Sequence, residues 1–138
     1  MEYGEGSALK LYRIMKRCKR MHLNIIAKVV YFLIQIVFNC VIPSTVEIGE
    51  RTRIAHGVGI VIHHNTIIGK ECVICQNVSI TNGNVHIGDN VLLGAGSVII
   101  GPCNIGNNVR IGANTVVNFD VPDNCTVVGV KGRIINRQ

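Results

Sequence analysis

Histidine is the residue type in this chain best suited to proton transfer near neutral pH, and the sequence contains five of them. A neutral imidazole can take a proton from a hydroxyl group and later return it, which makes histidine a common general base. His56 lies in the glycine-containing segment 55–59, and His86 follows the short polar segment 82–84. We predict that both are catalytic. An exposed turn with no chemical role is the alternative for each.

The six cysteines form no recognisable metal or disulfide pattern. Cys72 and Cys75 make one C-x-x-C pair, whereas a zinc site of this kind needs a second pair or suitably spaced histidines. The repeat described below gives Cys72 and Cys103 a structural place in the core. We see no secretory signal and expect a cytoplasmic protein, where disulfides are rare. We therefore predict no metal and no disulfide.

The strongest pattern in the chain is a six-residue period. Aliphatic residues recur every six positions, and a small or β-branched residue follows each of them by four positions. In a parallel β-helix each hexapeptide supplies a short strand and a turn, so the aliphatic side chains stack in a triangular core. The predicted aliphatic positions are Ile87, Leu93, Ile99, Ile105, Ile111 and Val117, and the predicted small positions are Val91, Ser97, Cys103, Val109, Thr115 and Val121.

The period is interrupted twice. Ile54 and Ile62 are eight residues apart, two more than the repeat requires, and Ile80 and Ile87 are seven apart, one more than required. Each interruption carries one of the two histidines named above. Places where a regular pattern breaks are often functional, which strengthens the catalytic prediction for both.

Residues 1–41 form a basic and apolar N-terminal arm. Its pattern is helical from Lys10 to Ile42 and ends at Pro43. The 14 residues between Lys28 and Pro43 are too few to cross a bilayer. The helix either packs on the domain or a sister subunit, or lies at the inner face of the membrane with its basic residues near anionic lipid. The predicted apolar stripe consists of Ile26, Val30, Leu33, Val37 and Val41.

Beyond the arm we expect a β-helix domain over residues 42–122 and a C-terminal tail over 123–138. The formal charge of +6 is concentrated in the arm, which holds seven of the 14 lysines and arginines. The charge is accompanied neither by aromatic residues that could stack on bases nor by a known nucleic-acid recognition motif. We therefore expect no nucleic-acid binding.

Three segments carry a family resemblance: residues 54–62 (IAHGVGIVI), 74–80 (ICQNVSI) and 121–134 (VPDNCTVVGVKGRI). Over roughly residues 42–135 the chain resembles the serine acetyltransferase-like branch of the hexapeptide-repeat acyltransferases. It is most similar to small exopolysaccharide and colanic-acid-type acetyltransferases, which also have a short apolar and basic arm. The resemblance implies an all-β fold, a left-handed parallel β-helix with a short N-terminal α-helical arm. It further implies acetyl-CoA as donor and a homotrimer with active sites between subunits.

The resemblance also implies roles for individual residues. His56 matches the catalytic histidine of the family, and His86 lies where a shortened loop re-enters the coil. His64 and Asn84 are candidate acceptor-binding residues, although a surface turn is the alternative for His64 and its neighbour His63. The candidates for binding CoA are Gly94, Ala95, Gly112 and Ala113, whose small size suits the pantetheine arm, and Lys131 and Arg133, whose charges suit phosphates unless they form a solvated tail.

The chain departs from serine acetyltransferases at the acceptor site. Val41 and Ala55 stand where that family has a carboxylate that orients the histidine and an aspartate that contacts serine, and the long acceptor loop is reduced to residues 82–84. We therefore predict O-acetylation of a surface-polysaccharide sugar or its precursor. The alternatives are a serine O-acetyltransferase of cysteine biosynthesis, a zinc enzyme similar to γ-class carbonic anhydrases, and a non-catalytic scaffold.

Overall fold

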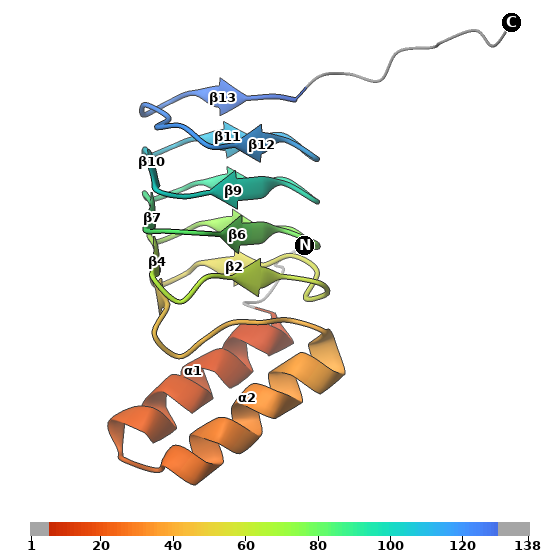
Figure 1. Ribbon diagram of the computed structural model, residues 1–138, viewed down its shortest axis with the longest axis vertical. Helices are drawn as coiled ribbons and strands as arrows, with labels where there is room; N and C mark the ends of the chain where they lie inside the picture. Colours follow the sequence, from red (N-terminus) through yellow and green to blue (C-terminus); the bar gives the residue numbers. More distant parts are fainter. Residues whose placement is uncertain (1–5, 130–138) are drawn as a thin grey trace, which may run out of the picture.

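The computed structural model describes residues 6–129, in which two helices lie at one end of a stack of short strands (Figure 1). The helices are α1 (Ser7–Arg20) and α2 (Asn24–Phe38). The strands are β1 (Glu47–Ile48), β2 (Arg53–Ile54), β3 (Val61–Ile62), β4 (Thr66–Ile68), β5 (Val73–Ile74), β6 (Ser79–Thr81), β7 (Val85–Ile87), β8 (Leu92–Leu93), β9 (Val98–Ile100), β10 (Cys103–Ile105), β11 (Arg110–Ile111), β12 (Val116–Val117) and β13 (Thr126–Val127).

The strands form three sheets that wrap around one core. The first sheet has the order β1-β4-β7-β10, the second β13-β11-β8-β5-β2 and the third β12-β9-β6-β3. All pairings between these strands are parallel, and the chain visits the first, second and third sheets in turn. The predicted left-handed parallel β-helix of hexapeptide repeats is confirmed.

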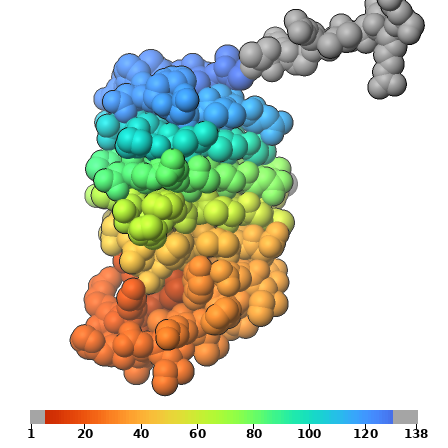
Figure 2. Space-filling view, viewed as in Figure 1, coloured from red at the N-terminus to blue at the C-terminus, as the bar shows by residue number. Residues whose placement is uncertain are grey.

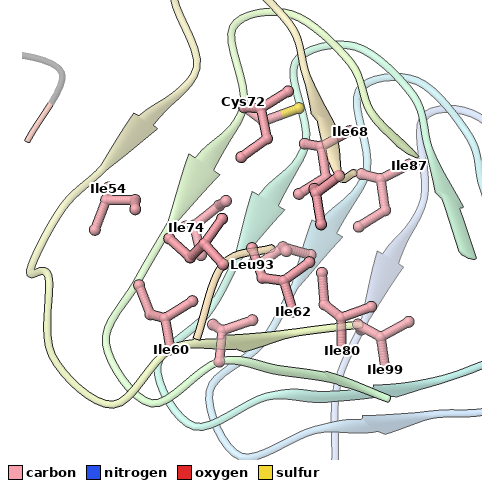
Figure 3. Packing of buried hydrophobic residues seen from close by; sticks show 14 of the residues in the cluster. Ile54, Ile60, Ile62, Ile68, Cys72, Ile74, Ile80, Ile87, Leu93 and Ile99 are labelled. Carbon is pink, nitrogen blue, oxygen red and sulfur yellow. The ribbon is translucent and has the colours of Figure 1, made fainter. Parts of the chain in front are cut away.

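The core consists of aliphatic columns, one beneath each sheet. In the third sheet Ile62 pairs with Ile80, which pairs with Ile99, and all three are at most 1% exposed. Figure 3 shows these side chains together with those of the other columns. The stack follows from the sequence because the short strands of successive coils turn their aliphatic side chains inward at the same positions. Cys72 and Cys103 are also buried in the core, as predicted.

The two interruptions of the repeat are looped out at corners without disturbing the pairing. Ile54 remains opposite Ile74 and Ile62 opposite Ile80, so the two extra residues bulge at the corner between β2 and β3. The single extra residue before Ile87 is accommodated in the same way between β6 and β7. The corners absorb these residues because a turn can lengthen while the strands on either side of it keep their parallel pairing.

The repeat ends differently from its prediction. Val121 was predicted at a small-residue corner position, but it lies opposite Ile105 in the aliphatic column. That prediction is wrong because the last coil is two residues shorter than the coil before it: Ile105 and Val121 are separated by 16 positions, whereas Ile87 and Ile105 are separated by 18. The solenoid also continues past residue 122, the expected boundary, since β13 pairs with β11.

The N-terminal arm contains two helices where the pattern predicted one. The chain turns at residues 21–23, and His22 takes a left-handed conformation with φ 59°. Tyr12 fixes α1 to the first coil, because its hydroxyl donates a 2.5 Å hydrogen bond to the carbonyl of Val46. Lys16 reinforces this contact by donating to the same carbonyl at 2.9 Å.

The predicted apolar stripe of the arm is only partly buried. Val30 is 8% exposed, as expected for an inward position, but Leu33 is 44% exposed and Val37 is 63% exposed. The inward face of α2 is formed instead by Ala27, Val30 and Ile34. The prediction was wrong for Ile26, Leu33 and Val37, because almost every residue of α2 is apolar and periodicity then cannot distinguish the two sides. Val41 lies beyond the helix, where it pairs with β3. Within residues 6–129, neither helix combines the length and apolar character needed to cross a membrane.

Candidate functional site

His56 lies on the bulge at the corner between the second and third sheets. The bulge closes tightly, since the backbone N–H of Val58 donates to the carbonyl of His56 at 2.9 Å. The imidazole is exposed, and it has no hydrogen-bond or ion-pair partner within residues 6–129 of one chain. It is therefore free to meet an external hydroxyl, and a neutral ring could accept its proton.

The corner that carries His56 recurs in each later coil, and we call it the His56 corner (residues 55–60, 75–78, 94–97 and 112–115). Glycines and alanines occupy it in the two later coils. The backbone N–H of Asn114 donates to the carbonyl of Ala95 at 2.8 Å, which holds two successive coils in register. Gly94 has no room for a side chain, because an added Cβ would lie 2.6 Å from the carbonyl oxygen of Ile111. The structure thus places the predicted CoA-binding residues in one line above His56: Gly94, Ala95, Gly112 and Ala113.

The structure adds three residues to this corner that the sequence interpretation did not include. Cys75, Gln76 and Asn77 lie in the coil between His56 and Ala95, and the N–H of Asn77 donates to the carbonyl of Val58 at 3.0 Å. The repeat could have predicted their position, because they precede Gly94 and Ala95 by one full turn of the coil. Burial raises the pKa of the Cys75 thiol, so this side chain is not a thiolate near neutral pH.

His86 lies on the other side of the solenoid. It is the middle residue of β7 in the first sheet, and its side chain points outward between Ile67 and Asn104. The first sheet is the side of the triangle opposite the His56 corner; in Figure 1, β4, β7 and β10 form the left edge. His56 and His86 of one chain therefore do not face a common space.

The predicted acceptor-binding residues lie at the corner between the third and first sheets. His64 is in the turn between β3 and β4, and Asn84 is in the turn between β6 and β7, one coil further along. Both are exposed, and the ring of His63 lies 4.1 Å from that of His64, centroid to centroid. The structure thus brings His64 and Asn84 to the same corner, but separates them from His56 within one chain.

The two positions that depart from serine acetyltransferases lie in the first coil. Val41 is half-buried, and its backbone pairs with that of β3 through a 2.7 Å hydrogen bond to the carbonyl of Ile60. Ala55 is half-buried beside His56. Neither side chain can orient an imidazole. The expected phosphate-binding residues Lys131 and Arg133 lie outside the described residues.

A hollow of about 1050 Å³ lies over the outer face of the second sheet, away from the candidate histidines. Its floor is formed by Val73 and Leu92, and arginines surround them, including Arg53 and Arg110. Arg110 is held in place by a 2.7 Å hydrogen bond to the carbonyl of Asn90. No group of three or more potential metal ligands occurs within residues 6–129.

Comparison with known proteins supports the family resemblance. Residues 84–118 match the bacterial transferase hexapeptide family (six repeats). A serine acetyltransferase of Synechococcus elongatus is 36% identical over 98% of this chain and 58% of its own length. A protein of Escherichia coli K12, named for acetyl transfer in colanic acid biosynthesis, is 36% identical over 89% of this chain and 85% of its own length.

A solved structure of a serine acetyltransferase in complex with CoA superimposes with a TM-score of 0.82 and 30% identity, covering 93% of this chain and 55% of that chain. The chain therefore spans only about half of the serine acetyltransferases it matches, but most of the colanic acid relative. From these likenesses and the repeat, the chain belongs to the hexapeptide-repeat acyltransferases, in their serine acetyltransferase-like branch.

Proposed function

We propose that this protein is an acetyl-CoA-dependent O-acetyltransferase with His56 as its general base. The observation that carries the proposal is the His56 corner, where an unpartnered imidazole is separated by one coil from the glycines and alanines of the two later coils. Small side chains leave space for a thin, extended molecule such as the pantetheine arm of CoA. A related structure contains CoA, which supports the same donor here.

In the proposed reaction His56 takes the proton of an acceptor hydroxyl, and the hydroxyl oxygen attacks the carbonyl carbon of the thioester. Backbone N–H groups of the glycine-containing corner are available to stabilise the negative oxygen that develops. The C–S bond then breaks, and the imidazolium of His56 returns the proton to the leaving sulfur. The products are an acetyl ester and free CoA, and no further reactant is needed. General base catalysis of this kind contributes roughly 10²–10⁴ to the rate.

The complete site requires a second subunit. His86 and Asn84 lie on a different side of the solenoid from His56, so they can join it only from a neighbouring chain. A closed homotrimer with parallel solenoids would bring the first sheet of one subunit toward the His56 corner of the next, and cyclic assemblies of this kind are common. In this arrangement His86 and Asn84 of the neighbour contact the acceptor.

For the acceptor we propose a saccharide hydroxyl, of a surface polysaccharide or its precursor. Val41 and Ala55 leave the first coil without the carboxylates that the family resemblance associates with serine. The chain covers 85% of the relative named for colanic acid biosynthesis, against 58% of the Synechococcus elongatus serine acetyltransferase. Serine is the competing acceptor, favoured by the serine acetyltransferases among the matches.

The test is release of free CoA from acetyl-CoA in the presence of L-serine, nucleotide sugars or a bacterial polysaccharide. We expect turnover with a saccharide acceptor, a loss of roughly 10²–10⁴ in rate for His56→Ala, and little change for His22→Ala, which removes an exposed histidine from the turn between the two helices. Turnover with L-serine, and with no saccharide, would identify serine as the acceptor instead. Equal rates for His56→Ala and the unmodified protein, with every acceptor, would overturn the proposed mechanism.

A further inference from the structure

Helix α2 is apolar on both sides, although only one side is covered. Its inward residues, Ala27, Val30 and Ile34, are at most 8% exposed. Ile25 and Ile36, on the opposite side, are 80% and 79% exposed. At about 100° per residue, four exposed apolar residues opposite the inward side fall within an arc of roughly 60° that faces away from α1 and the first coil, and three more extend the exposed arc to roughly 140°. They are Ile25, Val29, Phe32 and Ile36, and Ile26, Leu33 and Val37 widen the arc.

This outward face is too large to be incidental. Single exposed apolar side chains are common on protein surfaces, whereas a contiguous apolar patch usually marks an interaction site. Ile14 of α1, which is 50% exposed, and Met21 in the connecting turn, which is 60% exposed, add further apolar surface to the helix pair. The pair forms one end of the molecule, beyond the stacked coils (Figure 2).

The charge around this face identifies the partner that it fits. Neither α1 nor α2 contains an aspartate or glutamate. Several lysines and arginines of the two helices are exposed: Lys10, Arg17, Lys19, Arg20 and Lys28. An apolar helix face bordered by cations and free of carboxylates is the composition of helices that lie in the interface of an anionic bilayer.

We propose that the helix pair docks on an anionic lipid surface, with the outward face of α2 inserted among the acyl chains and the basic residues at the phosphates. The 15 residues of α2 span roughly 22 Å, which is shorter than the hydrocarbon core of about 30 Å, so the helix lies in the interface rather than crossing it. A second copy is the poorer occupant, because two surfaces of the same positive charge repel each other.

Docking of this end would bring the coil that carries His56 closest to the lipid. Gly57, the neighbour of His56, packs directly against the helices: a Cβ added there would lie 3.4 Å from the Cβ of Ala8 and 3.8 Å from the ring of Phe38. The His56 corner is therefore within reach of molecules anchored in the same membrane. This last step rests on the proposed acetyl transfer, whereas lipid docking does not.

The experiment is flotation of the full chain with vesicles of phosphatidylcholine alone and with vesicles that also contain phosphatidylglycerol. We expect binding to the anionic vesicles that weakens as salt is raised. The double variant Val29→Gln/Ile36→Gln should weaken this binding at least tenfold, and Lys10→Gln/Arg17→Gln should weaken it by roughly fivefold for each charge removed. Val128→Gln is the matched control, because Val128 is 73% exposed but lies at the opposite end of the solenoid. This variant should bind the vesicles as the unmodified chain does.

Three outcomes would overturn the proposal. The first is no binding to either kind of vesicle, and the second is equal binding by the control and the Val29→Gln/Ile36→Gln variant. The third is a change of oligomeric state in that variant, measured by light scattering, with vesicle binding intact; the outward face would then be a contact between subunits. CoA release is not measured here, so a failure of lipid docking and a failure of the proposed acetyl transfer remain distinguishable.

Discussion

His56 and His86 lie on opposite sides of the same triangular solenoid, one at the corner between the second and third sheets and the other on the outer face of the first sheet. The core between them is filled by close-packed aliphatic columns, so no motion of the side chains can bring the two imidazoles together within one chain. If both act in one reaction, each active site must combine two subunits.

This separation predicts that two inactive variants will complement each other. His56→Ala should lose at least roughly 10² in rate when alone, and His86→Ala should also lose activity because it removes a contact to the acceptor. Mixed trimers made by co-expression should regain activity, because about one quarter of the sites then join an intact His56 to an intact His86 from the neighbouring subunit. The measurement is CoA release by the purified mixed assembly.

Two results would contradict the complementation scheme. Full activity of His86→Ala alone would remove this histidine from the reaction. Two inactive variants that stay inactive in a verified mixed trimer would show that the site does not combine His56 of one subunit with His86 of another.

The His56 corner predicts a specific defect in donor binding. Ala113 is exposed on this corner, so Ala113→Tyr should obstruct the proposed path of the pantetheine arm while leaving the fold intact. We expect the KM for acetyl-CoA to rise about tenfold or more, with a smaller change in kcat, because an interaction made before and during the reaction is lost. Lys70→Tyr is the control, since Lys70 is exposed at the corner between the first and second sheets, where no residue of the proposed site lies. Equal KM values for the two variants would remove the proposed donor path.

Tyr12 predicts a loss of stability in alkaline solution. Burial of its ring, followed by the nearby charge of Glu47, raises the pKa of the Tyr12 hydroxyl well above its usual value. The stabilising effect of Tyr12 is present below the unfolded-state pKa of about 10 and is lost as pH rises above it, because only the unfolded chain can then release the proton. The free energy of unfolding should fall by up to about 1.4 kcal/mol per pH unit from this group.

Urea denaturation at several pH values above about 10 would measure this slope. Tyr12→Phe should show a shallower slope, although its stability near neutral pH is lower by about 1 kcal/mol because the hydrogen bond to Val46 is missing. The two proteins differ only at this hydroxyl, so the comparison isolates the tyrosine. If the free energy of unfolding fell equally steeply with pH in both proteins, the folded state would not raise the pKa of Tyr12.

The aliphatic column of the third sheet predicts a large effect from a single core truncation. Ile80 is fully buried between Ile62 and Ile99, so Ile80→Ala should lower the free energy of unfolding by about 2–5 kcal/mol through lost burial and a cavity. Ile36→Ala makes the same chemical change at a position that is 79% exposed, and should alter stability by less than about 1 kcal/mol. Comparable losses in the two variants would contradict the stacked core.

Much of this molecule could be predicted from the sequence alone, because the fold is local and repetitive. Each coil repeats the same short strand and turn, so a six-residue period of aliphatic residues specifies the sheets, the core columns and the buried places of Cys72 and Cys103. The same period located both interruptions and put Gly94 and Gly112 at one corner. These conclusions needed no contact between segments remote in sequence.

Only the tertiary structure decided the remaining features. The last coil is shorter than the others, and this places Val121 in the aliphatic column. Only the pairing of Val121 with Ile105 shows it, because the sequence period continues unchanged to Val117. The covered side of α2 depends on contacts with α1 and the first coil, since a helix that is apolar all round carries no directional signal in its sequence. His56 and His86 lie on different sides because of the sheets to which their neighbouring strands belong. That assignment depends on how many residues each corner contains, which the structure shows.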